Sequence, residues 1–233
     1  MTPARADFNA QAHETWRQLY ARQTPLRSQQ MIAEFSEGLD LLGITGSQIP
    51  DLAEVNIKLR ALTGWEGVFV RGLEMAESFF EMLADRKFPI GAFIRDIKDL
   101  SYTPEPDIFH DLYGHIPFFT IKAYADFCEE FGQRALKYRG DQLRLTQFQR
   151  LFWFTVEFAV IQVAGRRKIF GAGIASSFGE CAYALSDKPQ VVPFDLIKIR
   201  DQDFRIDLIQ DLLFELSSQE QLYTCLDQFE SVV

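Results

Sequence analysis

The sequence predicts a mainly α-helical domain with a few short β-strands, and three observations lead to this fold class. Apolar residues recur at helical spacing over most of the 233 residues. Strand-like runs are few and short, and the strand–helix alternation of a doubly wound parallel sheet is missing. With 47% hydrophobic and 24% charged residues, the chain is long and apolar enough to bury one large core.

The first third of the chain is expected to form four helices. In each of them, apolar residues such as Trp16 and Phe35 have apolar neighbours three or four positions away. Gly43 and Gly64 supply the stop signals after the second and third. The expected helices cover 8–22, 29–42, 51–63 and 72–86.

The rest of the chain alternates further helices with short extended pieces. The segment 88–94 is strand-like, and the two prolines within 101–106 predict a loop. Short strands are expected near 168–171 and 190–199. Further helices are expected over 107–114, 121–137, 142–164, 176–186 and 205–229.

Charge and cysteine content exclude several classes of protein. The chain has 24 Lys and Arg against 33 Asp and Glu, a formal net charge of −9. A nucleic-acid-binding protein needs a basic face, so that class is excluded. Three widely spaced cysteines favour reduced thiols in a cytoplasmic protein over a disulfide framework. Neither a membrane span nor a secretory signal is predicted, because long apolar runs are missing.

Two of the three histidines, His110 and His115, lie in the short segment from Pro106 to Pro117. On an ideal α-helix, five residues correspond to about 140° of rotation, so the two side chains do not share a stripe as those of an HExxH motif do. A chain that turns after Gly114 can still bring both imidazoles to one point. The alternative is a pair of hydrogen-bonded histidines in a partly buried turn.

Glu157 is the single charged residue within 151–165, a run apolar enough to be buried on all sides. A buried carboxylate is costly unless it is paired or bound to a metal. Two imidazoles and one carboxylate are the ligands of the 2-His-1-carboxylate triad, which holds non-haem Fe(II) and leaves positions open for O₂ and substrates. The alternatives are an arginine partner for Glu157 and a zinc hydrolase site, although neither HExxH nor a second carboxylate as general base is evident.

The segment 171–180, with the sequence GAGIASSFGE, is rich in small residues that let the backbone approach a ligand closely. Ser176 or Ser177 can cap the helix that follows. Neither GxGxxG nor a P-loop pattern occurs, so a nucleotide site is not predicted. Arg95 precedes the proline-containing loop and can clamp a carboxylate with two N–H groups, the alternative being a solvated surface arginine.

Three motifs resemble those of the pterin-dependent aromatic amino acid hydroxylases, which include phenylalanine, tyrosine and tryptophan hydroxylases. The motifs are YTPEPDIFHD over 102–111, WFTVEF over 153–158 and GAGIASSFGE over 171–180. They occur in the order typical of the family, and the resemblance spans residues 14–225. It implies a mostly helical catalytic domain that uses Fe(II), a tetrahydropterin such as tetrahydrobiopterin, and O₂ to hydroxylate the ring of a free aromatic amino acid.

The resemblance also assigns roles residue by residue. It implies a metal site formed by His110, His115 and Glu157. Asp107 matches an acidic residue that would orient His110, and Glu180 matches a glutamate behind the site. The remaining positions form a substrate set, Arg95, Thr103, Asp107, Trp153 and Ser176, and a pterin set, Gly72, Leu73, Phe79 and Asp111.

The chain departs from the family pattern at three positions near the site. Phe152 replaces a tyrosine that commonly precedes the tryptophan, Ala76 replaces a serine of animal members, and Glu74 brings a charge into the pterin loop. Because of these changes, the sequence does not identify which pterin is the natural cofactor. Because the sequence shows no counterpart of the N-terminal regulatory domain or the C-terminal tetramerisation helix of animal enzymes, we expect one catalytic domain over 1–233 that is a monomer or a dimer.

L-Phenylalanine is the expected substrate and L-tyrosine the expected product, because single-domain bacterial members of the family are mostly phenylalanine hydroxylases. Hydroxylation at position 3, giving meta-tyrosine, is the first alternative, followed by tryptophan or tyrosine as substrate. The motifs around the iron serve oxygen chemistry that all of these reactions share. Hypotheses from other classes are a catalytically silent binding protein and a zinc hydrolase.

Overall fold

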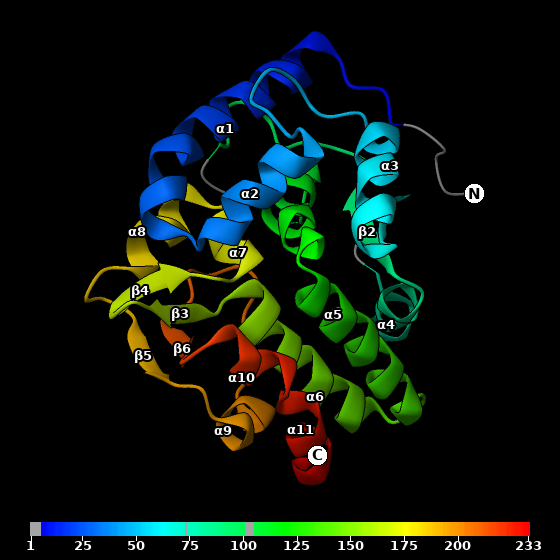
Figure 1. Ribbon diagram of the computed structural model, residues 1–233, viewed down its shortest axis with the longest axis vertical. Coiled ribbons are helices and arrows are strands. Elements are labelled where there is room, and N and C mark those ends of the chain that lie inside the picture. Colours follow the sequence, from blue (N-terminus) through cyan, green and yellow to red (C-terminus); the bar gives the residue numbers. More distant parts are fainter. Residues whose placement is uncertain (1–5, 73, 101–104) are drawn as a thin grey trace.

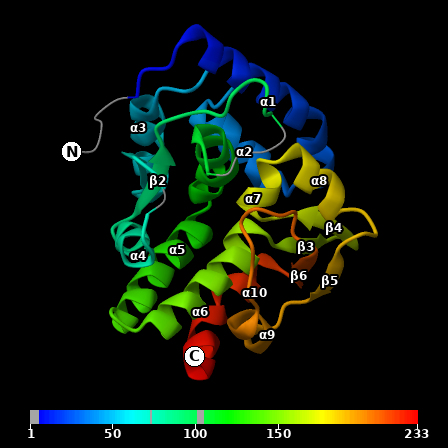
Figure 2. The same cartoon turned by 180° about the vertical axis from the view of Figure 1, so that it is seen from behind.

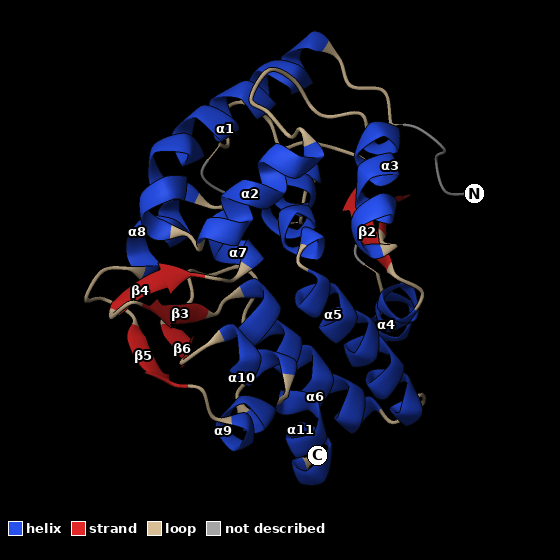
Figure 3. Ribbon diagram, viewed as in Figure 1, coloured by secondary structure: helices blue, strands red, loops and turns tan. Residues whose placement is uncertain are grey.

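The structure, a computed structural model, describes residues 6–72, 74–100 and 105–233. Helices form most of it, as the sequence predicts, and a four-stranded sheet lies to one side of them (Figures 1 and 3). Within these ranges, no helix combines the length and the apolar character needed to span a bilayer.

The N-terminal helices lie where the apolar spacing predicts them, but the first is longer than expected. It continues past residue 22 and through Pro25, because its buried face extends as far as Gln23. Gly43 and Gly64 adopt the left-handed conformation just after the second and third helices, which confirms both as stop signals. These helices are α1 (Ala10–Gln30), α2 (Ala33–Leu42) and α3 (Leu52–Thr63).

A two-stranded parallel sheet and one helix form the next unit. The expected strand over 88–94 is present as β2, whereas the sequence does not predict its partner β1, a five-residue strand with a glycine and two valines. The expected helix over 72–86 begins later, because Gly72 has a φ of 141°, which is not helical. The elements are β1 (Glu66–Val70), α4 (Ala76–Ala84) and β2 (Lys87–Gly91).

The central helices depart from regular α-helix at two places. The α-helix expected over 107–114 is instead a π-helix that leads into a 3₁₀-helix. A second π-helix continues from the end of α6. In chain order the elements are η1 (His110–His115), η2 (Ile116–Thr120), α5 (Lys122–Ala135), η3 (Leu136–Tyr138), α6 (Gln142–Phe152) and η4 (Trp153–Glu157).

Aromatic rings fill the core between these helices. The ring of Phe131 contacts those of Phe80, Phe148 and Phe152, with centroids 5.5–5.8 Å apart. Phe152 in turn meets the ring of Phe79 edge-on at 4.9 Å. The many phenylalanines of the sequence therefore form one continuous aromatic core that reaches the site described below.

The four-stranded sheet corrects two sequence predictions. The helix expected over 142–164 ends at Glu157, because the β-branched run that follows is a strand joined to the next one by the two-residue turn of Ala164 and Gly165, both at positive φ. The helix expected over 205–229 is a loop, a strand and two short helices. The strand order is β4-β3-β6-β5, with β3–β4 antiparallel and the other pairs parallel. The strands are β3 (Val160–Val163), β4 (Arg166–Ile169), β5 (Gln190–Pro193) and β6 (Leu212–Leu216).

Short helices surround this sheet. The helix expected over 176–186 is shorter than expected, because it begins only after its cap Ser177, and a separate short helix precedes it. The strand expected over 190–199 covers only β5 before a helix begins. The rear view shows that the segment between α9 and β6 rises to the level of α7 before it returns to the sheet (Figure 2). The helices are α7 (Ala172–Ala175), α8 (Phe178–Ala184), α9 (Leu196–Asp201), α10 (Gln219–Tyr223) and α11 (Cys225–Val232).

Candidate active site

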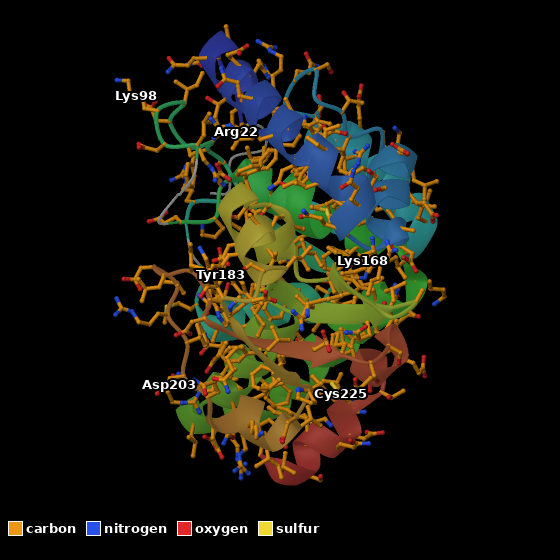
Figure 4. All side chains as sticks on the ribbon, turned by 90° about the vertical axis from the view of Figure 1, so that its left-hand side faces the viewer. Arg22, Lys98, Lys168, Tyr183, Asp203 and Cys225 are labelled. Carbon is orange, nitrogen blue, oxygen red and sulfur yellow. The ribbon has the colours of Figure 1, made fainter. Side chains whose placement is uncertain are left out.

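A cavity of ≈ 620 Å³ is lined by residues of the two-stranded sheet, of η1 and η4, and of α7 and α8. In Figure 4, Lys98 marks the loop that carries Arg95, and Asp203 marks the segment that carries residues 206–209. Both loops lie along the same side of the molecule, and both contribute lining residues to the cavity. A cavity of this size holds small-molecule ligands.

The π-helix η1 brings His110 and His115 together. A π-helix pairs residue i with residue i+5, so side chains five positions apart lie on the same face instead of about 140° apart. The two Nε2 atoms are accordingly 3.0 Å apart. The expected turn after Gly114 is absent, because η1 runs directly into η2, and the widened helix itself brings the imidazoles together.

Glu157, the last residue of η4, completes a group of three potential metal ligands. Its carboxylate oxygens lie 3.0 Å from Nε2 of His115 and 3.6 Å from Nε2 of His110. Among the described residues, these three offer donor atoms that all lie within 4.8 Å of one another. Bonds of about 2.1 Å that meet at right angles place neighbouring donor atoms about 3.0 Å apart, so the group fits one face of an octahedral iron ion.

The protonation states of His110 and Glu157 also suit a metal. Burial lowers the pKa of His110 to about 4, against the opposing pull of Glu157, so the imidazole is neutral at pH 7. Burial alone would raise the pKa of Glu157, but the two imidazoles outweigh it and hold the pKa below its ordinary value. A carboxylate and neutral imidazoles are the forms that bind a divalent cation.

The hydroxyl of Ser176 lies within hydrogen-bond distance of the His110 ring nitrogen that faces away from Glu157 and His115. The family resemblance assigns the role of orienting this ring to Asp107. The Oγ of Ser176 is 2.9 Å from Nδ1 of His110. Asp107 instead accepts the backbone N–H of His110 at 3.0 Å and has no bond to the ring. The difference arises because Asp107 lies one turn before His110 on the same segment, whereas Ser176 approaches the ring from the end of α7. The Nδ1 of His115 is buried and has no hydrogen-bond partner in the described part of the chain.

Two glycines allow the elements around the metal ligands to approach so closely. A Cβ on Gly114 would lie 2.8 Å from the carbonyl oxygen of Ala172, at the start of α7. A Cβ on Gly171 would lie 2.2 Å from the carbonyl oxygen of Glu157. Neither distance is possible for a real side chain, so η1, η4 and α7 can meet at the site only with glycine at these positions.

Arg95 is buried in the cavity wall rather than solvated, and it pairs with Asp107. Its Nε and Nη2 donate to the two carboxylate oxygens at 2.8 and 2.9 Å. Burial would raise the pKa of Asp107, but the hydrogen bonds and charge of Arg95 hold it below its ordinary value. Two of the five guanidinium N–H groups are thus used, and three remain for another acceptor such as a substrate carboxylate.

Three of the residues assigned to the pterin also line the cavity. Gly72, Phe79 and Asp111 all border it. Asp111 accepts the backbone N–H of Gly91 at 2.7 Å, and burial raises its pKa well above the ordinary value. An aromatic ring, a glycine and a buried hydrogen-bonding carboxyl suit a planar heterocycle with polar edges. Leu73 and Thr103 lie outside the described residues.

Trp153, assigned to the substrate, has partners that the sequence does not reveal. Its ring stacks on Phe204 with centroids 4.4 Å apart, and its indole N–H donates to Oε1 of Gln210 at 3.0 Å. The amide of Gln210 also donates to the carbonyl oxygens of Arg205 and Leu208. Gln210 thereby links Trp153 to residues 205–210, which we call the rim segment. The sequence does not reveal this role, because its apolar spacing predicts a helix over 205–229.

Glu180 lies in the same wall, in the first turn of α8, and the residue is only 9% exposed. Burial raises its pKa to about 7, against an opposing hydrogen bond from the backbone N–H of Gln210. Ser176, Trp153 and Glu180 therefore share one side of the cavity with the metal ligands.

Comparison with known proteins agrees with this site. Residues 2–233 match the family described as biopterin-dependent aromatic amino acid hydroxylase. Phenylalanine-4-hydroxylase of Chromobacterium violaceum is 41% identical to this chain over 217 residues, which cover 93% of this chain and 73% of that protein.

Two crystal structures of phenylalanine hydroxylase from Chromobacterium violaceum have the same fold. One, with bound iron(III) and the oxidised cofactor 7,8-dihydrobiopterin, has a TM-score of 0.90 at 40% identity and covers 96% of this chain and 81% of that one. The other, with bound iron and phenylalanine, has a TM-score of 0.87 at 39% identity and covers 94% and 80%.

Proposed function

Because this chain belongs to the biopterin-dependent aromatic amino acid hydroxylases, we propose that it converts L-phenylalanine to L-tyrosine with Fe(II), a tetrahydropterin and O₂. The group of His110, His115 and Glu157 carries this proposal, since its donor atoms have the spacing of a facial triad. When bound, iron and the tetrahydropterin supply the electrons and the site for activating O₂, one atom of which enters the ring.

The side chains of the cavity position the reactants. His110, His115 and Glu157 hold the metal from one side only and leave its other side open to the cavity. Arg95, fixed by Asp107, takes the carboxylate of the amino acid with its remaining N–H groups. The ring of the substrate lies against Trp153, so the carbon nearest the metal is set by these two anchors.

The proposal is tested by loading the protein with Fe(II) under anaerobic conditions and then adding tetrahydrobiopterin, O₂ and each aromatic amino acid in turn. We expect L-tyrosine from L-phenylalanine, identified by NMR, together with oxidation of the pterin. His115→Ala should lose stoichiometric Fe(II) binding and turnover, because two donors on one face hold the ion weakly.

His13→Ala is the matched control. His13 accepts the backbone N–H of Ile49 far from the cavity, so its removal should leave iron content and product formation unchanged. Zinc retention without pterin oxidation, or full hydroxylation by the His115→Ala protein, would contradict the proposed function.

We also propose that the enzyme works in the reducing cytoplasm as a monomer or a dimer. All three cysteines are buried and free, and burial raises the pKa of Cys181 to about 12, which keeps this thiol unreactive. Size-exclusion chromatography with light scattering distinguishes the two assembly states.

A further inference from the structure

We propose that Glu180 binds the α-ammonium group of the amino acid substrate, while Arg95 binds the carboxylate. The inference rests on the proposed function and adds a recognition element to it. It would make the enzyme selective for a free zwitterionic amino acid, because the cavity wall would supply both a cation and a carboxylate.

The first observation is a buried carboxylate oxygen that has no partner. Oε2 of Glu180 is fully covered and has no hydrogen bond in the described part of the chain. The side chain as a whole is 9% exposed and borders the cavity together with Arg95 and Trp153. A buried acceptor without a donor lowers the stability of the folded protein by about 1–3 kcal/mol. Because Glu180 borders a ligand cavity, we infer that the donor is supplied by the ligand.

Glu180 accepts one backbone N–H, that of Gln210, and keeps Oε2 without a partner. Among the described residues, the other buried acids of the cavity have no covered oxygen without a partner: Asp107 holds the guanidinium of Arg95, Glu157 lies beside the two histidines, and Asp111 accepts a backbone N–H. No Lys, Arg or His nitrogen of the described residues lies within salt-bridge distance of Glu180. Burial without a cation also raises the pKa of this carboxyl.

A purely structural role at the start of α8 does not account for this side chain. Ser177 caps the helix and accepts the N–H of Glu180 at 3.3 Å, so the sequence Ser-Phe-Gly-Glu has the form of a capping box. In a capping box, the glutamate would accept the backbone N–H of Ser177. That N–H instead donates to the carbonyl of Ile174 at 3.0 Å, so the carboxylate of Glu180 has no role in a capping box.

The ligand that fits must bring one anionic and one cationic group. Arg95 has three unused N–H groups for a carboxylate, and Glu180 has an unused oxygen for an ammonium. A free α-amino acid carries both groups on one carbon. 3-Phenylpropanoate has the same ring and carboxylate but lacks the ammonium, so it probes Glu180 specifically.

The test measures equilibrium binding of L-phenylalanine and 3-phenylpropanoate to the anaerobic Fe(II) protein by titration calorimetry. We expect Glu180→Gln to weaken L-phenylalanine about 10- to 100-fold, the effect of losing a charged hydrogen bond, and to leave 3-phenylpropanoate within about twofold. Arg95→Lys is the matched variant and should weaken both ligands, because both carry the carboxylate.

Two results would overturn the proposal. Unchanged L-phenylalanine affinity in Glu180→Gln would remove Glu180 from recognition, and an equal loss for both ligands would assign it a structural role only. Should this variant not fold, the unmodified protein still decides, since equal affinity for the two ligands contradicts an ammonium site. A failure of the proposed function would instead appear as absent hydroxylation by the unmodified protein, whatever the binding data show.

Discussion

Two adjacent serines, Ser176 and Ser177, have different roles in the structure. The first contacts Nδ1 of His110, and the second caps α8. A partner behind a metal-binding imidazole fixes the tautomer and orientation of the ring, whereas a helix cap contributes only to stability.

For Ser176→Ala we expect Fe(II) affinity and turnover to fall about 10- to 100-fold, because the ring of His110 loses the group that orients it. Ser177→Ala is the control. It should lower the free energy of unfolding by about 1 kcal/mol and leave iron binding intact. Competition with a fluorescent Fe(II) chelator measures the first effect and urea unfolding the second. Equal iron affinity in the two variants would rule out the orienting role.

At the scale of the element, the two π-helices decide where the metal ligands point. η1 aligns His110 with His115, and η4 ends at Glu157. The small residues of α7 let this helix pack against both π-helices. Gly114 of η1 lies directly against the carbonyl oxygen of Ala172, the first residue of α7.

Gly114→Ala should therefore push α7 away from η1. The new methyl group would lie 2.8 Å from the carbonyl oxygen of Ala172 and 3.0 Å from Cβ of Ser176, and such overpacking costs about 1–3 kcal/mol. We expect a lower melting temperature and weaker Fe(II) binding through the displaced Ser176. Gly179→Ala, whose Cβ meets nothing within 4 Å, should keep both properties. A Gly114→Ala protein with full iron affinity would show that α7 does not position Ser176.

The identity of the metal ligands could be predicted from the sequence, but their geometry could not. A buried run with one carboxylate, and two histidines in one turn, are visible as residue types. Whether a helix widens from i+4 to i+5 pairing depends on its tertiary neighbours, so the 140° separation expected for His110 and His115 was a consequence of assuming an α-helix. The same holds for Asp107 and Ser176, because side chains 66 positions apart in sequence leave no local signal of their contact.

At the scale of the whole molecule, the helical fold class could be read from apolar spacing, while the sheet could not. β6 lies among apolar residues that also fit a helix, and its neighbours β3 and β5 are distant in sequence. Strands of four or five residues carry too few alternations to be distinguished from helix by period alone. For the same reason, the sequence does not predict that the segment containing Gln210 is a loop beside the cavity.

The dependence of stability on pH is also a property of the whole molecule, and Glu180 contributes to one window of it. The folded state raises its pKa to about 7 from an ordinary value of 4.5, so the folded protein binds more protons than the unfolded chain between these values. The free energy of unfolding therefore falls as pH rises through this window, by up to about 3 kcal/mol. Glu180→Gln removes the dependence, so its melting temperature relative to the unmodified protein should rise by roughly 5–10 °C from pH 4.5 to 7 and stay level above.

Thermal melts of the metal-free proteins between pH 4.5 and 8.5 measure this difference. Melting curves that run parallel across the whole range would show that Glu180 titrates alike in both states.

The three segments that build the metal site have a consequence for biosynthesis. The ligands come from η1 and η4 and their supporting serine from the end of α7, and these elements are separated by 38 and then 15 positions along the chain. A growing polypeptide cannot present all of them until residue 176 has left the ribosome and the aromatic core has closed around them. Metal selection is thus made by the finished fold, and the iron content of the enzyme reflects which divalent ions are available in the cell at that moment.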